Sequence, residues 1–103
     1  MAQAGTDILI VLTPGETLVA PMDMTLLGAA ASLGTAGTTL STLTVNHNGV
    51  ATSFAPTVAA SAASGSEVTG SLAIVAGDTL TVSAVYGTTA AGGAVSLWLQ
   101  RNV

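Results

Sequence analysis

Thr38–Phe54, with the sequence TTLSTLTVNHNGVATSF, decides the fold class. Its apolar and polar residues alternate with a period of two, which is the pattern of a half-buried β-strand. Leu43, Val45 and His47 fall on one side of this strand. Asn48-Gly49 then supplies two residues that tolerate positive φ, as the centre of a type I′ hairpin turn requires. The stretch therefore predicts a β-hairpin whose second arm carries the chain back along the first.

Strand signals recur along the rest of the chain. Thr79–Tyr86 alternates as cleanly as the hairpin, and Ala94–Arg101 places Trp98 on the side opposite to its leucines. Short strands at a spacing of about 8–12 residues, separated by turn signals, favour an antiparallel sandwich or barrel. We therefore expect an all-β fold, an antiparallel β-sandwich of about eight short strands. The remaining expected strands are Asp7–Thr13, Glu16–Ala20, Asp23–Leu33, Thr57–Ala63 (a strand or an extended edge) and Glu67–Ile74.

Four details of these strands can be compared directly with a structure. The continuous apolar run Ile8–Leu12 indicates burial on both faces of its strand. Met24, Leu26 and Ala30 are expected on one face of the third strand. Ser64-Gly65-Ser66 is expected to form a turn, and Gly70 a bulge or a point of close approach.

The composition indicates one domain with an unusual surface. A chain of 103 residues fits a single domain, expected at residues 7–103 behind a small-residue arm at residues 1–6. Charged residues make up 6% of the chain, whereas soluble domains carry about 25%. Either a Thr/Ser-rich surface keeps the protein in solution, or neighbouring subunits cover much of it. We favour the second interpretation, because large exposed apolar patches usually mark interfaces.

Charge and composition exclude several classes of partner and cofactor. A net charge of −4 with a single Lys or Arg cannot neutralise a phosphate backbone or an anionic membrane surface. The absence of cysteine excludes disulfides and thiolate metal sites. MAQAGTD at the N-terminus lacks the features of a signal peptide. The longest apolar run is far shorter than the ~20 residues of a membrane span. We therefore expect a soluble protein made without an export signal.

No residue pattern indicates catalysis, a metal site or a cofactor. His47 is the only histidine, and no serine lies in a nucleophile-elbow context that it could activate. One histidine with scattered carboxylates also lacks the spacing of a zinc site. We expect His47 to form hydrogen bonds locally, beside the hairpin turn. Asp23 and Asp78 follow turns, where aspartate usually accepts hydrogen bonds from backbone amides. The protein is therefore not expected to be an enzyme.

Trp98 has three possible roles. An outward tryptophan on a strand can anchor a protein interface or stack on a sugar ring. A bulge that shifts the register would instead place it in the core. Only Gln100, Arg101 and Asn102 are near it in sequence as polar partners for a sugar.

From Val19 onward the chain resembles a jelly-roll-type β-sandwich domain found in structural proteins of tailed bacteriophages. At the hairpin this family often has Lys where the present chain has His47. The segments that carry the resemblance are Ala20–Thr25 (APMDMT), Leu33–Thr38 (LGTAGT), Leu43–Gly49 (LTVNHNG), Val75–Val82 (VAGDTLTV) and Gly93–Leu99 (GAVSLWL).

The resemblance implies a virion structural protein, and the size of the chain resembles that of a capsid decoration (cement) protein. Such a protein binds the outer surface of the phage head, and we expect a homotrimer that contacts the major capsid protein. Ile8, Leu9 and Ile10 near the arm, together with Trp98, are the expected interface residues. Two alternatives stay open: a tail or fibre module that binds host-surface glycans, and another structural subunit of the virion.

Overall fold

The structure is a computed structural model that describes residues 7–101, apart from the side chains of Asp7, Ile8, Ser66 and Arg101. The expected arm at residues 1–6 lies outside this range. Within residues 7–101 there are nine strands: β1 (Asp7–Leu12), β2 (Thr17–Val19), β3 (Met24–Ser32), β4 (Ser41–His47), β5 (Val50–Ala51), β6 (Thr57–Val58), β7 (Ser64–Ile74), β8 (Thr79–Val85) and β9 (Ala94–Arg101).

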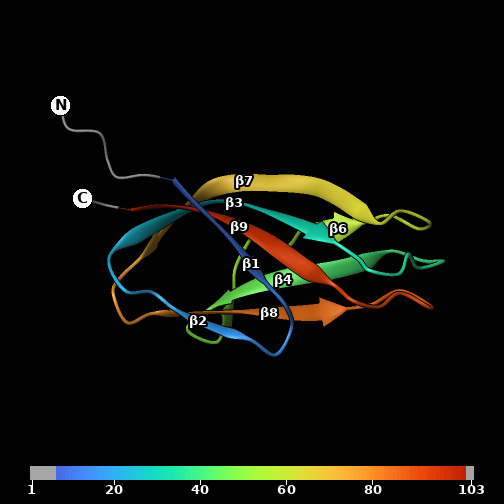
Figure 1. The fold of residues 1–103 in the computed structure, drawn as a ribbon, viewed down its shortest axis with the longest axis horizontal. Coiled ribbons are helices and arrows are strands. Elements are labelled where there is room, and N and C mark those ends of the chain that lie inside the picture. The colour runs from blue at the N-terminus through green and yellow to red at the C-terminus, as the bar shows by residue number, and fades with distance from the viewer. Residues whose placement is uncertain (1–6, 102–103) are drawn as a thin grey trace.

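The strands form two antiparallel sheets that pack face to face (Figure 1). We call them sheet A, with the order β1-β9-β3-β7, and sheet B, with the order β2-β8-β4-β5 and with β6 also paired to β4. The ladders are nested along the chain: β1 pairs with β9, β2 with β8, β3 with β7, and β4 with β5 and β6. Nested ladders of this kind arise when one long hairpin is rolled into a sandwich, which is the jelly-roll arrangement. The expected all-β, jelly-roll-like sandwich is confirmed.

One hydrophobic core fills the space between the sheets. The inward residues of each strand alternate with outward ones, as the pleat of a strand dictates. Leu43 and Val45 of β4 and Leu80 of β8 are almost fully buried, as the alternation predicted. Val95, Leu97 and Leu99 of β9 meet them from sheet A.

The predicted hairpin is present, with Asn48 at φ 52° and Gly49 at φ 82°. These two positive values are what a type I′ turn needs. The return arm leaves regular strand geometry after β5 but stays bonded to β4, because the amide of Val45 donates to the carbonyl of Phe54 at 2.8 Å. The Phe54 side chain is 3% exposed and lies beneath Gly70 of β7.

The predicted burial of β1 on both faces is wrong. β1 is an edge strand of sheet A, so only one of its faces covers the core. Leu12 is buried, whereas Leu9 and Val11 are 72% and 59% exposed. A continuous apolar run is also compatible with an edge strand whose outer face meets another molecule.

The predicted facing of Ala30 is also wrong, because β3 is bulged. Register shifts fall between Leu26 and Gly28 against both neighbouring strands. Met24 and Leu26 face the core as predicted, but beyond the bulge Ala29 and Ala31 do so in place of Ala30. On β7 the extra residue lies between Thr69 and Leu72, which confirms the irregularity predicted at Gly70.

The turn expected at Ser64-Gly65-Ser66 is instead the first part of β7. Gly65 is there because of a close approach: a Cβ atom at this position would overlap the carbonyl oxygen of Thr57. Sequence alone could not separate this role from a turn, since the contact joins residues of two different strands.

Two glycines of sheet A offer a matched test of this contact. A Cβ at Gly28 would meet its nearest neighbours at 3.4 and 3.5 Å, ordinary contacts. We expect Gly65→Ala to lower the free energy of unfolding by about 1–3 kcal/mol, as overpacking does. Gly28→Ala should leave it unchanged or raise it by about 0.4–1 kcal/mol through the lower entropy of the unfolded chain. Urea unfolding of the two variants checks this, and equal losses would contradict the assignment.

Candidate functional site: an apolar patch on the outer face of sheet A

Trp98 faces away from the core, as the alternation of β9 predicted. Its neighbours Leu97 and Leu99 are fully buried, whereas Trp98 is 41% exposed. The alternative that placed Trp98 in the core is therefore wrong. An exposed indole in the centre of a sheet offers a large contact area with little conformational entropy to lose on binding.

The ladders of sheet A place two exposed aliphatic residues beside Trp98. Trp98 lies directly opposite Leu9 of β1 on one side and Gly28 of β3 on the other. Val11 follows two residues after Leu9, so it lies on the same face of β1. Directly opposite residues in a sheet have their Cβ atoms about 4.5–5.5 Å apart, which is within contact distance. We call Leu9, Val11 and Trp98 the apolar patch.

Small side chains and one carboxylate border the apolar patch. Gly28 carries no side chain, and Ser96 lies opposite both Val11 and Ala30. A Cβ at Gly28 would lie 3.4 Å from Oε2 of Glu67, so the Glu67 carboxylate reaches over Gly28 from β7. The outer face of sheet A thus changes from apolar at β1 to acidic at β7.

The outer face of sheet B is different in chemistry. Asn46 of β4 donates from Nδ2 to Oγ of Ser83 on β8 at 2.8 Å. Thr44 lies opposite Ser83, and Thr81 lies opposite both Asn46 and Thr17. Hydroxyl and amide groups therefore dominate this face, and its exposed valines, Val19 and Val85, lie on different strands near opposite ends.

The four interface residues expected from the sequence do not share one face. Leu9 and Trp98 are opposite each other on the outer face, whereas Ile10 packs against the core. The backbone of Ile8 pairs with Leu99, and its side chain is outside the described part of the structure. Val11 was missed, although its position two residues after Leu9 would have identified it once β1 was treated as half buried.

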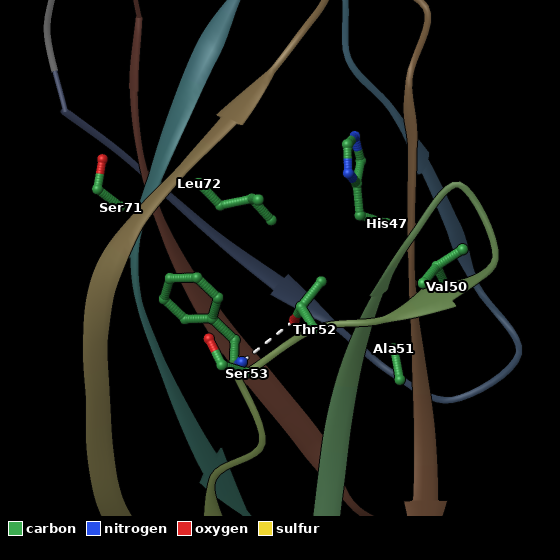
Figure 2. Close-up of a pocket in the computed structure, with 8 residues that line it drawn as sticks. His47, Val50, Ala51, Thr52, Ser53, Ser71 and Leu72 are labelled. Atoms are coloured by element: carbon green, nitrogen blue, oxygen red, sulfur yellow. Dashed lines mark hydrogen bonds between the residues drawn. The ribbon is translucent and has the colours of Figure 1, made fainter.

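A cavity of about 330 Å³ lies between β7 and the β4–β5 hairpin. Figure 2 shows Ser71 and Leu72 on one wall, across from His47 and the return arm of the hairpin. Two of its polar side chains already have partners: the Thr52 hydroxyl donates to the carbonyl of Val45 at 2.7 Å, and the His47 ring bonds to Asp78. The cavity is at the small end of ligand sites, which span about 300–1,000 Å³. We therefore assign no ligand to it.

His47 connects the hairpin to the turn between β7 and β8. Its Nε2 donates to Oδ2 of Asp78 at 2.7 Å, and the same carboxylate oxygen accepts the amide of Val75 at 2.9 Å. The hydrogen bond from His47, followed by those from Val75 and Asn48, lowers the pKa of Asp78 from 3.8 to about 2. His47 forms a hydrogen bond beside the hairpin turn as expected, but the partner, Asp78, is 31 residues away in the sequence rather than local.

Carboxylate and amide side chains satisfy backbone amides between the turns at this end of the sandwich. Asp23 accepts a hydrogen bond from the amide of Ala76 at 3.0 Å, and Asn48 accepts one from the amide of Thr79 at 2.9 Å. The expected turn role of the aspartates holds, but Asp23 serves the turn of another hairpin rather than its own. These contacts position the turns, and both aspartates act in them as hydrogen-bond acceptors.

The described residues hold no group of three or more His, Cys, Asp or Glu side chains placed to bind a metal ion. In the same part of the chain, no helix is long and apolar enough to cross a membrane.

Comparison with protein-family models, with curated proteins and with solved structures finds no match for the chain. The apolar patch is therefore the feature that most needs a functional explanation.

The contact between His47 and Asp78 predicts how stability depends on pH. Folding lowers the pKa of Asp78 from 3.8 to about 2, so its contribution is present above pH 3.8 and is lost as the pH falls to about 2. We expect Asp78→Asn to lower the urea midpoint near neutral pH and to flatten its decline between these two pH values. If the urea midpoints of the unmodified protein and of Asp78→Asn fall in parallel as the pH decreases, Asp78 does not contribute to the pH dependence of stability.

The histidine partner can be tested separately. Because the hydrogen bond from His47 is the largest cause of the shift, His47→Gln should raise the pKa of Asp78 toward its ordinary value of 3.8. NMR titration of the Asp78 carboxyl carbon measures this directly. An unchanged Asp78 titration in His47→Gln would assign the shift to the backbone amide instead.

Proposed function

We propose that the protein is a virion structural protein of the capsid decoration type, which binds the outer surface of a phage head through the apolar patch. Its partner is the major capsid protein, and its role is to add buried area across the boundaries between capsid subunits. The arm at residues 1–6, the virion location and assembly as a homo-oligomer belong to the same proposal.

The single observation that carries the proposal is the exposure of Leu9, on the edge strand β1, directly opposite Trp98 on the neighbouring strand β9. With Val11 they form an apolar surface that is bordered by the small residues Gly28 and Ser96. Interfaces are enriched in aromatic residues, and tryptophan is among the residues whose truncation most often weakens binding. A protein-binding surface accounts for this arrangement.

Two further properties of the chain support a structural role. Charged residues make up only 6% of it, which fits a protein that keeps part of its surface against neighbours. The jelly-roll order of the strands agrees with the fold that the resemblance to phage structural proteins implies. A fold does not fix a function, so the apolar patch carries more weight than the strand order.

The location of the protein in particles tests the proposal. We expect antibodies raised against the protein to label the heads of virions from the encoding phage, with extra density on the outer shell in electron cryo-microscopy. Heads from a deletion mutant should lack that density and should break at a lower temperature. Labelling of the tail, or of no particle at all, would contradict capsid decoration. Tail labelling together with Trp98-dependent binding on a glycan array would favour the fibre alternative.

The role of the apolar patch can be tested on isolated heads. Trp98→Ala should weaken binding to heads that lack the protein by about 30-fold or more, since hot-spot residues contribute about 2 kcal/mol or more. Val85→Ala is the matched control, because Val85 is 71% exposed on the opposite sheet. Titration of heads with labelled protein measures both affinities. If the two variants bind equally well, the apolar patch is not the docking surface.

A further inference from the structure

The two sheets have four edges within the described residues, and three of them are unsuited to pairing with another chain. The edge strand β2 of sheet B has only three residues. At the other edge of that sheet, β5 and β6 have two residues each and are separated by Pro56. The edge strand β7 of sheet A is bulged near Gly70 and carries Glu67. Short strands, proline, bulges and charges are the devices by which proteins prevent edge-to-edge pairing.

The fourth edge, β1, has none of these devices apart from one charge at its end, Asp7. It is six residues long and contains no proline, glycine or lysine. Its ladder with β9 runs from Asp7 to Leu12 without a register shift. No other strand of residues 7–101 pairs with its outer side. A regular, apolar strand with one free edge is a template for another strand.

We propose that β1 is a self-association site, where the β1 strands of two copies pair antiparallel about a two-fold axis and join their A sheets into one continuous sheet. The occupant is a second copy of this chain. This inference rests on the edges of the sheets and does not depend on capsid decoration. It puts a two-fold dimer in place of the trimer expected from the sequence.

Symmetry favours a second copy over another edge of the same protein. A two-fold rotation maps one strand of an antiparallel pair onto the other. Two copies can therefore pair through the same edge strand, and the assembly closes as a dimer. Pairing β1 with β2, β5 or β7 of a neighbour would instead need one of the three unsuited edges. The free edge therefore indicates a dimer rather than a ring or a filament.

The charges of β1 also permit this pairing. Asp7 is its single charged residue and lies at one end. With Leu9 opposite Leu9 of the second copy, the two Asp7 backbone positions lie four residues apart along the strand, which is about 14 Å. Charges at that separation are largely screened, because the Debye length is about 8 Å at physiological ionic strength.

The side chains favour two registers. Directly opposite residues of an antiparallel pair point to the same face, so Leu9 opposite Leu9, or Leu9 opposite Val11, of the second copy keeps the exposed residues on the outer face and gives Leu9 an apolar partner. In the first register, four side chains lie in a row across the joined sheet: Trp98 and Leu9 of one copy, followed by Leu9 and Trp98 of the second copy. The apolar patches of two copies would then form one surface.

Cysteine cross-linking tests the pairing without background, because the chain has no cysteine. Opposite residues in a sheet have Cα atoms about 4.5–5.5 Å apart, inside the range that a disulfide spans. We expect oxidation to cross-link either Leu9→Cys alone or a mixture of Leu9→Cys and Val11→Cys. Val85→Cys is the control, with an exposure of 71% against 72% for Leu9. If the β1 variants cross-link no more than Val85→Cys, the proposal is wrong.

Sedimentation equilibrium of the unmodified protein gives the second test. The expected mass at high concentration is twice that of one chain, and a monomer or a trimer would overturn the pairing. Leu9→Lys should weaken the dimer about tenfold or more, since in the first register it brings two like charges together. At a concentration where both proteins are monomeric, its melting temperature should match that of the unmodified protein, because Leu9 is exposed in the single chain.

Trp98→Ala separates this inference from the proposed function. Trp98 lies on β9 and is not on the free edge, so the variant should still form the dimer while it loses binding to heads. A dimer that binds no phage head would keep the inference and refute decoration. Head binding by a protein that stays monomeric would support decoration and refute the pairing through β1.

Discussion

The insertion of β9 between β1 and β3 is the constraint on which the rest of the structure depends. β9 forms ladders with both strands, and its inward residues Val95, Leu97 and Leu99 are fully buried. The ladder with β1 joins residues from the two ends of the described chain, so sheet A is completed only when the last strand is in place. Pairing at such long sequence separation is slow to form. It also determines the surface, because it places Trp98 in the middle of the outer face and leaves β1 as an edge.

The scarcity of charge is consistent with how the carboxylates are used. Glu16 accepts hydrogen bonds from the amide and the hydroxyl of Thr13 at 2.9 and 2.6 Å, and these bonds lower its pKa. Asp23 and Asp78 each accept an amide from a turn, and Asp78 also binds His47. These side chains organise turns by hydrogen bonding. Hydroxyl and amide groups dominate the outer face of sheet B, whereas exposed apolar side chains gather at the patch on sheet A.

Local patterns were sufficient for the strands whose neighbours are close in sequence or whose alternation is regular. The hairpin at Asn48-Gly49, the facing of β8 and the bounds of β9 agree with the sequence, because turn chemistry and a period of two determine them. The errors have a common physical origin in contacts between distant segments. The sequence indicates a turn at Gly65 because the close approach of this residue to Thr57 leaves no local signal. A regular alternation places Ala30 on the core face, because the bulge in β3 depends on the registers of two partner strands.

The candidate site was only partly predictable for the same reason. Trp98 was expected to face outward, but the sequence could not show that Leu9 lies directly opposite it or that Gly28 lies on its other side. Ile10 was included because adjacent residues in a strand are easily grouped together, although they point to opposite faces. The free edge of β1 became visible only from the strand order, since each of the other edges has its own protection.

The central claim is that the protein acts through the β1 and β9 side of sheet A. Hydrogen–deuterium exchange, compared between the free protein and the protein bound to phage heads, tests it most directly. We expect binding to slow amide exchange in β1 and β9, while exchange in β2 and β8 of sheet B stays as it is in the free protein. Slower exchange confined to sheet B, or no change in either sheet, would contradict it.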